Sequence, residues 1–106
     1  MANIDIKDVR KYILTDNVKW TDHCSFRMFE RGIHQEDVQR AILNGDIIEQ
    51  YPEDYPYPSC LIIGYNYNNE IIHVVCGIGD GKLYIITVYC PDREKWINDV
   101  IRRDNK

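Results

Sequence analysis

The sequence predicts an α+β fold in which short helices come first and an antiparallel sheet follows. Apolar residues recur at three- and four-residue spacings through the first 44 residues, which is the pattern of amphipathic helices. From residue 46 onward the chain changes to short runs rich in Ile, Val and Tyr, separated by turn residues. Helices grouped before consecutive strands are typical of an α+β domain with its helices packed on one face of the sheet.

The first two helices are predicted from their apolar stripes and their ends. The first covers residues 5–14 and is ended by a polar break. The second begins at a cap supplied by Thr21 or Asp22, because either side chain can accept a hydrogen bond from the first turn. It runs to Arg31, and Gly32 supplies the left-handed residue that commonly ends a helix.

The third helix is expected to follow the second after a tight corner. His34 occupies its cap position, Asp37 lies three residues later, and Asn44-Gly45 ends the helix. Four strands then follow, joined by hairpin turns at Asn68-Asn69 and at residues 79–81. The predicted strands run from Ile47 to Tyr51, Cys60 to Tyr67, Ile71 to Ile78 and Leu83 to Cys90.

The chain is expected to close with a fourth helix after Pro91-Asp92 stops the last strand. Its apolar positions are Trp96, Ile97, Val100 and Ile101. Between the first two strands, the Pro/Tyr-rich segment 52–58 must be a surface loop or a sheet edge, since proline cannot donate to a ladder. The full expectation is therefore N-terminal helices packed on a four-stranded antiparallel sheet, with a C-terminal helix.

Length and composition narrow the class of protein. A chain of 106 residues is expected to form a single domain, residues 1–106. The net charge of −4 argues against a protein held on nucleic acid by bulk electrostatics, although a local basic patch is compatible with it. No signal peptide or membrane span is recognisable, so we expect a cytoplasmic protein whose four cysteines are reduced.

The second helix carries the most informative polar pattern. At about 100° per residue, His23, Arg27 and Arg31 fall within roughly 80° of one another on the helix surface. Guanidinium groups fit phosphate and imidazole transfers protons near neutral pH, so the stripe suits phosphate binding or phosphodiester cleavage. The alternative is structural: the arginines pair with nearby carboxylates, and the histidine caps or packs locally.

Three polar residues of the sheet form a second candidate group. His73 lies within the third predicted strand, and Thr87 and Tyr89 share one face of the fourth. If these faces adjoin, the three side chains form a polar floor. The alternative is a half-buried, hydrogen-bonded histidine, with the tyrosines of the Pro/Tyr-rich loop packing against one another.

The known metal and cofactor motifs are not recognisable. The sequence has no C-x-x-C, H-x-x-x-H, Walker A or G-x-S-x-G pattern, so neither a metal ion nor a cofactor is expected. Cys24 lies beside His23, which suggests a thiolate nucleophile if the thiol is exposed and its pKa is lowered.

Four blocks of the chain, taken together and in order, carry a family resemblance. They are His23-Cys-Ser-Phe-Arg27-Met-Phe-Glu-Arg31-Gly32-Ile33; Gly45-Asp-Ile-Ile-Glu49 with Tyr51 and the Pro/Tyr-rich loop; Ile72-His73-Val74-Val75; and Ile86-Thr87-Val88-Tyr89-x-Pro91-Asp92-x-x-x-Trp96. Over about residues 20–103 they resemble the bacterial domain of unknown function 4258 family. That family is grouped with the RelE/ParE/BrnT toxin-like superfamily.

The resemblance implies a compact α+β domain with an antiparallel sheet. It also implies a toxin-like protein, since some members of that superfamily are ribosome-dependent ribonucleases paired with an antitoxin, while others inhibit gyrase or have no assigned activity. The recurring positions of the family fall here on six residues. They are His23, Arg27, Arg31, His73, Thr87 and Tyr89.

Two main hypotheses follow. In the first, the chain is a metal-independent endoribonuclease of a toxin-antitoxin type pair: Arg27 and Arg31 bind phosphate, His23 or His73 is the general acid or base, and its partners are RNA and a small antitoxin-like protein. In the second, it is a non-catalytic protein-interaction module with a structural arginine stripe, which the acidic charge and the missing nucleophile favour. A small-ligand pocket between helix and sheet is a third option.

Overall fold

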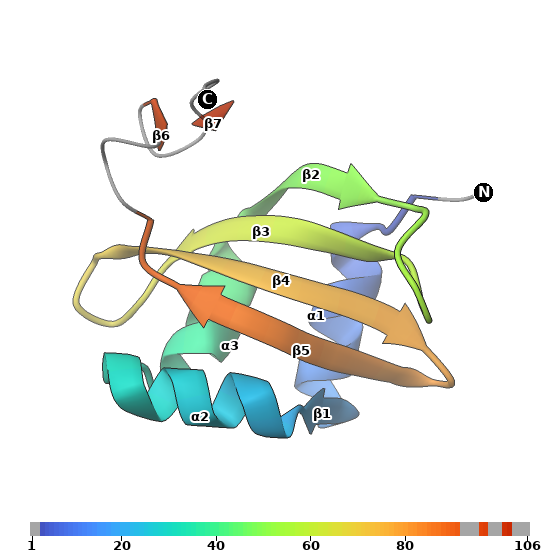
Figure 1. Cartoon of the computed structure of the whole chain (residues 1–106), viewed down its shortest axis with the longest axis horizontal. Coiled ribbons are helices and arrows are strands. Elements are labelled where there is room, and N and C mark those ends of the chain that lie inside the picture. The colour runs from blue at the N-terminus through green and yellow to red at the C-terminus, as the bar shows by residue number, and fades with distance from the viewer. Residues whose placement is uncertain (1–2, 92–95, 98–100, 103–106) are drawn as a thin grey trace.

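Three helices in the first half of the chain pack with a twisted sheet built mainly from the second half (Figure 1). The computed structural model describes residues 3–91, 96–97 and 101–102. In chain order the elements are α1 (Ile6–Leu14), β1 (Val18–Trp20), α2 (Asp22–Arg31), α3 (Gln35–Asn44), β2 (Asp46–Tyr51), β3 (Ser59–Tyr65), β4 (Ile71–Gly79), β5 (Lys82–Tyr89), β6 (Trp96–Ile97) and β7 (Ile101–Arg102).

The main sheet has five strands in the order β1-β5-β4-β3-β2. The four long strands pair antiparallel, as expected, but β1 pairs parallel with β5 through Val18–Trp20 against residues 83–85. The prediction of a purely antiparallel four-stranded sheet was therefore wrong. Three residues are too few to show a period of two, so nothing in the local sequence marks β1 as a strand.

The predicted C-terminal helix was also wrong where the structure describes it. Residues 96–97 and 101–102 form two short antiparallel strands, with Trp96 opposite Arg102 and Ile97 opposite Ile101. The spacing of the apolar residues here fits a hairpin as well as a helix, and β-branched residues favour strands. Val100, the remaining apolar position of the predicted helix, lies outside the described residues.

The ends of α2 and α3 confirm the predicted caps. The Thr21 hydroxyl oxygen accepts a hydrogen bond from the Cys24 backbone N–H at 3.1 Å, and Gly32 ends α2 with φ of 68°. At the start of α3, the Asp37 carboxylate accepts from the His34 backbone N–H at 3.2 Å. The Thr21 cap starts α2 directly after β1. Gly32 and the cap at His34 turn the chain sharply between α2 and α3.

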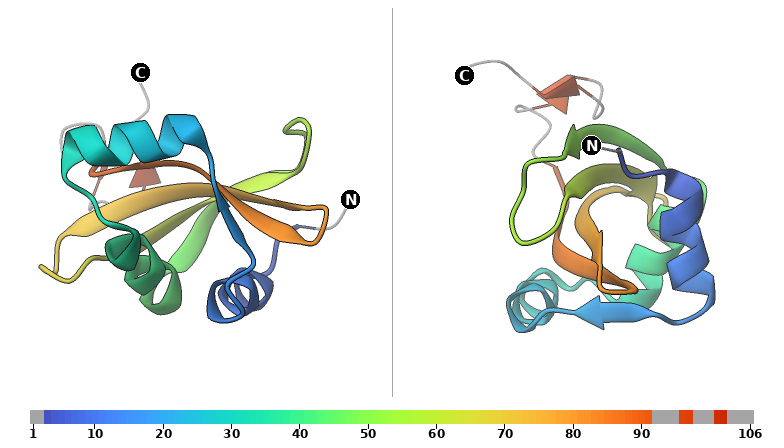
Figure 2. Two further views of the ribbon diagram at one scale, coloured as in Figure 1. Left: turned by 90° about the horizontal axis from the view of Figure 1, so that it is seen from below. Right: turned by 90° about the vertical axis from the view of Figure 1, so that its right-hand side faces the viewer.

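One apolar core is shared by all three helices and one face of the sheet. Figure 2 shows α1 and α3 under that face, while α2 runs along β5. The helices contribute Val9, Ile13, Cys24, Met28, Val38, Ala41 and Ile42, and the turn between α2 and α3 contributes Ile33. The strands contribute Cys60, Ile62, Ile72, Val74, Cys76, Leu83, Ile85 and Val88. None of the helices that the structure describes is long and apolar enough to pass through a bilayer.

The Pro/Tyr-rich segment between β2 and β3 is a loop, as predicted. Tyr57 stacks on Tyr84 of β5 with ring centroids 5.4 Å apart, and its ring lies directly against Gly79. Tyr55, by contrast, is 95% exposed. The loop thus packs one of its own rings onto the end of the sheet and leaves another in solvent.

Candidate functional site

α2 takes over the edge of β5 where β1 ends. β1 pairs with β5 only as far as Ile85, and beyond that point α2 lies beside the strand. The Thr21 hydroxyl donates to the backbone carbonyl of Ile85 at 3.2 Å, and Nη1 of Arg31 donates to that of Val88 at 2.7 Å. The helix therefore satisfies edge carbonyls that a longer β1 would have paired.

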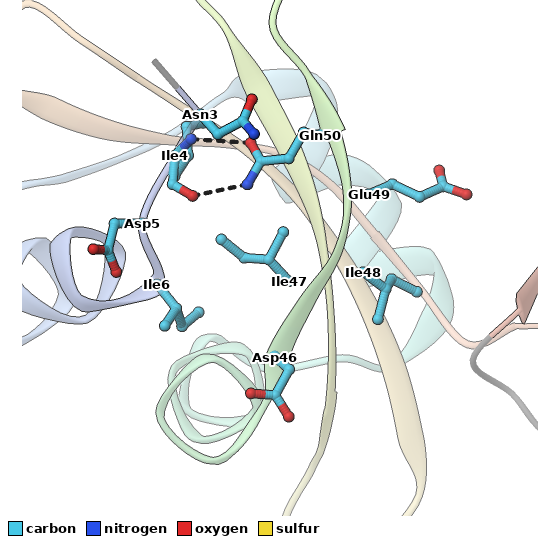
Figure 3. Close-up of a pocket in the computed structure, with 9 residues that line it drawn as sticks. All are labelled: Asn3, Ile4, Asp5, Ile6, Asp46, Ile47, Ile48, Glu49 and Gln50. Atoms are coloured by element: carbon cyan, nitrogen blue, oxygen red, sulfur yellow. Dashed lines mark hydrogen bonds between the residues drawn. The ribbon is translucent and has the colours of Figure 1, made fainter.

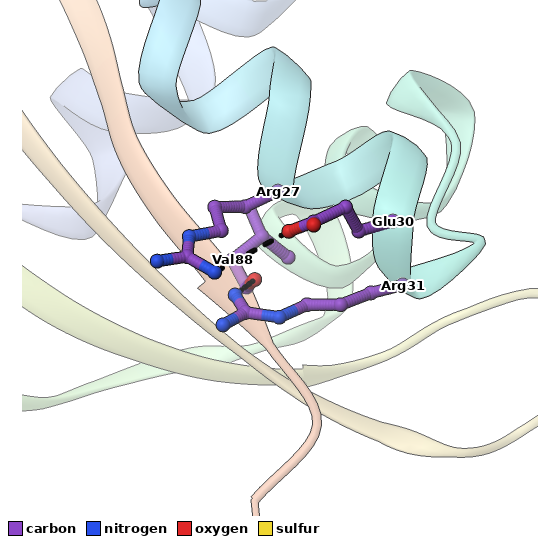
Figure 4. A network of polar contacts seen from close by, with 4 residues as sticks. All are labelled: Arg27, Glu30, Arg31 and Val88. Atoms are coloured by element: carbon purple, nitrogen blue, oxygen red, sulfur yellow. Dashed lines mark hydrogen bonds and ion pairs between the residues drawn. The ribbon is translucent and has the colours of Figure 1, made fainter.

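The two arginines of the predicted stripe lie together at this edge. In Figure 4, the guanidinium groups of Arg27 and Arg31 both extend from α2 across β5. Arg27 forms an ion pair with Glu30 at 3.3 Å, and both of these side chains are 44% exposed. Because a guanidinium group has five N–H donors, one contact on each arginine leaves donors available to an anion.

His23 lies one turn before Arg27 and is exposed to solvent. It shares the face of α2 that carries the arginines, as the spacing predicted, but it stands toward the end of the helix nearest β1. An exposed imidazole can exchange protons with a bound molecule. The stripe is thus intact, although its arginines already serve contacts within the fold.

The second predicted group lies on the sheet face that points away from the core. His73 of β4 is opposite Tyr89 of β5, with ring centroids 5.4 Å apart, and Thr87 is opposite Val75 on the same face. His73 is 0% exposed, whereas Thr87 and Tyr89 are half-buried. The two faces therefore adjoin, which was the condition for a polar floor, but a fully buried His73 cannot touch a substrate in this conformation.

The thiolate hypothesis for Cys24 is wrong. Its side chain is 0% exposed and lies in the core, with Sγ 3.5 Å from the Met28 sulfur. Burial raises the pKa of the Cys24 thiol to about 11, and the charge of Arg31 offsets only part of that effect. A buried, protonated thiol is a packing group rather than a nucleophile.

Acidic and sulfur ligands do not gather in the described part of the chain. No group of three or more His, Cys, Asp or Glu side chains among those residues could hold a metal ion. Cys60 and Cys76 face each other across β3 and β4 with sulfurs 3.9 Å apart, and both are buried, free thiols. Cys90, just past β5, is exposed.

Two exposed phenylalanines on α2 were missed by the sequence reasoning. Phe26 is 59% exposed and Phe29 is 84% exposed. Near them, a hollow between α2 and α3 is lined in part by Met28, Phe29 and Ile33. The signal was present: the two phenylalanines are about 60° apart on the helix and roughly opposite the buried stripe of Cys24 and Met28.

A family model matches residues 20–90 of the chain, and its description is "Domain of unknown function" (DUF4258). The match begins at the last residue of β1 and continues past the end of β5, so it includes α2 and the sheet face that carries His73 and Tyr89. Searches of curated proteins and of solved structures returned no significant match.

Proposed function

We propose that this chain, which belongs to the family described as a domain of unknown function (DUF4258), is a protein-interaction module. Its contact surface is the outward face of α2. The observation that carries this proposal is the exposure of Phe26 and Phe29, at 59% and 84%, one turn apart on the same helix. Scattered single apolar residues are ordinary on a protein surface, but adjacent exposed rings beside an apolar hollow mark an interaction site.

The energetics favour a protein partner at this face. Each phenyl ring gains about 1.5–3 kcal/mol when it is transferred fully from water into an apolar contact, so two rings form a strong anchor. Asp22 lies between the two rings on the helix surface, whereas the neighbouring Glu30 is paired with Arg27. The partner that fits is therefore a protein with an apolar pocket and a basic group opposite Asp22.

The state of the predicted catalytic residues supports a non-catalytic role. Arg31 donates to the Val88 carbonyl and holds α2 at the edge of β5, while Arg27 is paired with Glu30 on the helix itself. His73 is 0% exposed. A structural arginine stripe beneath an exposed aromatic face accounts for each of these contacts without a reaction.

A toxin-like endoribonuclease is the second candidate, and the convergence of Arg27 and Arg31 over β5 favours it (Figure 4). The donors left on both guanidinium groups could bind a phosphodiester and the charge that develops on it. The exposed His23 could take the proton from an attacking ribose 2′-hydroxyl, and Thr87 with Tyr89 would position the substrate. A small antitoxin-like protein would then act by covering the arginines.

Site-specific photocrosslinking in a bacterial host separates these functions. A photoreactive phenylalanine analogue is placed at Phe29 and, as a control, at Leu14 of α1, which is 73% exposed. We expect a discrete adduct with one protein from position 29 only, and we expect Phe26→Ser to remove that adduct. Because both rings are exposed, Phe26→Ser should change the free energy of unfolding by no more than about 0.5 kcal/mol.

The same cells report on the catalytic candidate. If expression of the wild-type chain arrests growth and degrades RNA, and if His23→Ala or Arg27→Ala abolishes both effects in a folded protein, the ribonuclease is correct and the interaction module is not its primary role. Equal crosslinking from positions 14 and 29 would also contradict the proposal, since it would show contact without a preferred surface.

A further inference from the structure

The sheet ends at β2, and the outer edge of this strand has different neighbours from the edge of β5. No strand follows β2 in the sheet order of the described residues. Residues 3–6 run past this edge, but they do not pair with its backbone. The side-chain amide of Gln50 contacts them instead: its Oε1 accepts from the Ile4 N–H at 3.0 Å and its Nε2 donates to the Ile4 carbonyl at 2.8 Å (Figure 3).

This pair of hydrogen bonds holds the N-terminal segment at a side chain's length from the strand. A primary amide offers the same donor and acceptor as a peptide group, so Gln50 gives Ile4 the pairing that a neighbouring strand would give. Between the segment and the strand there is a hollow of about 580 Å³. Among the described residues, its lining comes from residues 3–6 and 46–50.

The walls of this hollow have a consistent chemistry. Its apolar side chains are four isoleucines: Ile4, Ile6, Ile47 and Ile48. Its charged side chains are all acidic: Asp5, Asp46 and Glu49. In Figure 3 Ile47 points toward Ile4 and Ile6, while Glu49 lies on the other side of the strand. A ligand along this edge would meet Ile47 with Ile4 and Ile6 on one side of the strand, Ile48 with Glu49 on the other, and Asp46 at the first residue of the strand.

We propose that the outer edge of β2 binds an extended segment of another protein, in which basic side chains alternate with apolar ones. The segment adds a strand beside β2, so its backbone pairs with edge groups that no strand of the described residues reaches. Its apolar side chains pack on the isoleucines, and its basic side chains pair with the carboxylates of Asp46 and Glu49. This site is separate from the face of α2 and does not depend on the function proposed there.

The geometry also limits the length of the added strand. The register between β2 and β3 shifts between Ile47 and Glu49, which is a β-bulge that leaves Ile48 without an opposite residue. Bulges bend an edge and interrupt long pairing. The segment that fits is therefore shorter than β2 itself, which spans the six residues Asp46–Tyr51, and pairs over about three to five residues.

The test uses the full chain and a synthetic probe. The probe is a fluorescein-labelled octapeptide of alternating Lys and Val, and binding is measured by fluorescence anisotropy at low and moderate salt. We expect saturable binding that Asp46→Lys weakens at least tenfold. The matched control is Asp8→Lys, which makes the same charge change on exposed α1, outside the hollow, and should weaken binding less than twofold.

A second probe tests strand addition without altering the protein. The same octapeptide with alternate backbone amides methylated keeps its charge and side chains but loses hydrogen-bond donors. We expect it to bind at least tenfold more weakly, and we expect the parent peptide to shift the backbone amide NMR signals of residues 46–50. Equal binding of the two peptides would overturn strand addition, and equal losses in the two Lys variants would reduce the site to net charge.

One further outcome bears on the identity of the occupant. The chain itself ends with the basic residues Arg102, Arg103 and Lys106. Sedimentation of the protein alone should give a monomer at micromolar concentration. A dimer that Asp46→Lys dissociates would overturn the assignment to another protein, because a second copy of this chain would then occupy the edge.

Discussion

The two edges of the main sheet differ in what covers them. At the β5 edge, β1 pairs over three residues, and α2 then supplies Thr21 and Arg31 as donors to the carbonyls of Ile85 and Val88. At the β2 edge the neighbouring segment reaches only a side chain, Gln50. The chain thus closes the β5 edge with its own backbone and with side chains of α2. At the β2 edge it holds residues 3–6 too far from the strand for backbone pairing.

This difference changes the meaning of the His-x-x-x-Arg-x-x-x-Arg spacing. A helix that replaces a strand along an edge must present donors to carbonyls that have no partner strand, and Arg31 does so. Arg27, one turn earlier, has its contact on the helix itself. Of the three residues, Arg31 therefore makes a structural contact with the sheet, while His23 and Arg27 remain a surface stripe. Single variants separate the structural role from a binding role.

The largest expected effect comes from Gly64→Ala, at the contact that seats α3 behind the open edge. A Cβ at Gly64 would lie 2.1 Å from the Ala41 carbonyl oxygen of α3, so helix and strand would have to move apart. We expect the free energy of unfolding in urea to fall by about 3 kcal/mol or more. Such a loss would show that the β2 side of the sheet is held firmly by its buried face, although its edge is open.

Gly32→Ala is the matched control for this prediction. Gly32 has open space around it but a φ of +68°, so alanine there adds backbone strain without overlap, at about 1 kcal/mol. A Gly64→Ala cost no greater than that of Gly32→Ala would contradict the close contact between α3 and β3.

Local signals in the sequence were enough to predict the helix ends and the four long strands. As helix caps, Thr21, Gly32 and Asp37 act through neighbours within four residues, so this role can be predicted from the local sequence. Gly64 is different. A glycine inside a strand usually weakens that strand. The reason for Gly64 is its close contact with Ala41 of α3, about 20 residues earlier, which the local sequence does not show.

In the candidate site, too, some features follow from the local sequence and others depend on contacts between distant segments. The helical stripe follows from a period of 3.6 and was predicted. A period of two assigns the faces of β4 and β5 but not their register, so the adjacency of His73 and Tyr89 was left as a condition that the structure fulfils. The burial of His73 and the bond from Arg31 to Val88 depend on contacts between distant segments, which spacing does not encode. The exposed phenyl rings could have been found from the helical wheel, since they lie opposite the buried stripe.

The next largest effect is expected from Arg31→Met, with Arg27→Met as its control. The pair tests whether α2 closes the β5 edge. Methionine keeps most of the aliphatic stem but removes the donor to the Val88 carbonyl. We expect Arg31→Met to lower the free energy of unfolding by about 1–2 kcal/mol, because a partly buried carbonyl loses its partner. Arg27→Met breaks only an exposed ion pair and should cost at most about 0.5 kcal/mol.

Backbone amide exchange gives the spatial readout for this pair of variants. In Arg31→Met the amides of α2 should exchange faster than in the wild type, while those of β3 and β4 should not change. Equal losses of stability in the two variants would mean that the bond to Val88 contributes no more than the surface pair, and the β5 edge would then be closed by packing alone.

The smallest effect is expected at alkaline pH, through Cys24, which anchors α2 in the core beside β5. Burial raises the pKa of this thiol from 9.0 to about 11, so between these values the unfolded chain loses the proton while the folded chain keeps it. Stability therefore falls as the pH rises through this window, and Cys24 should account for about 1 kcal/mol of loss between pH 8 and pH 10.

Cys24→Ala removes this contribution and leaves the other cysteines in place. The wild type should lose about 1 kcal/mol more than the variant over the same pH interval, measured by urea denaturation at each pH. The amides of α2 should also lose protection before those of β2, because local opening of α2 is enough to expose the thiol and let it ionise. The same pH dependence in both proteins would place the ionising group elsewhere, and α2 would then owe its position to the edge contacts of Thr21 and Arg31.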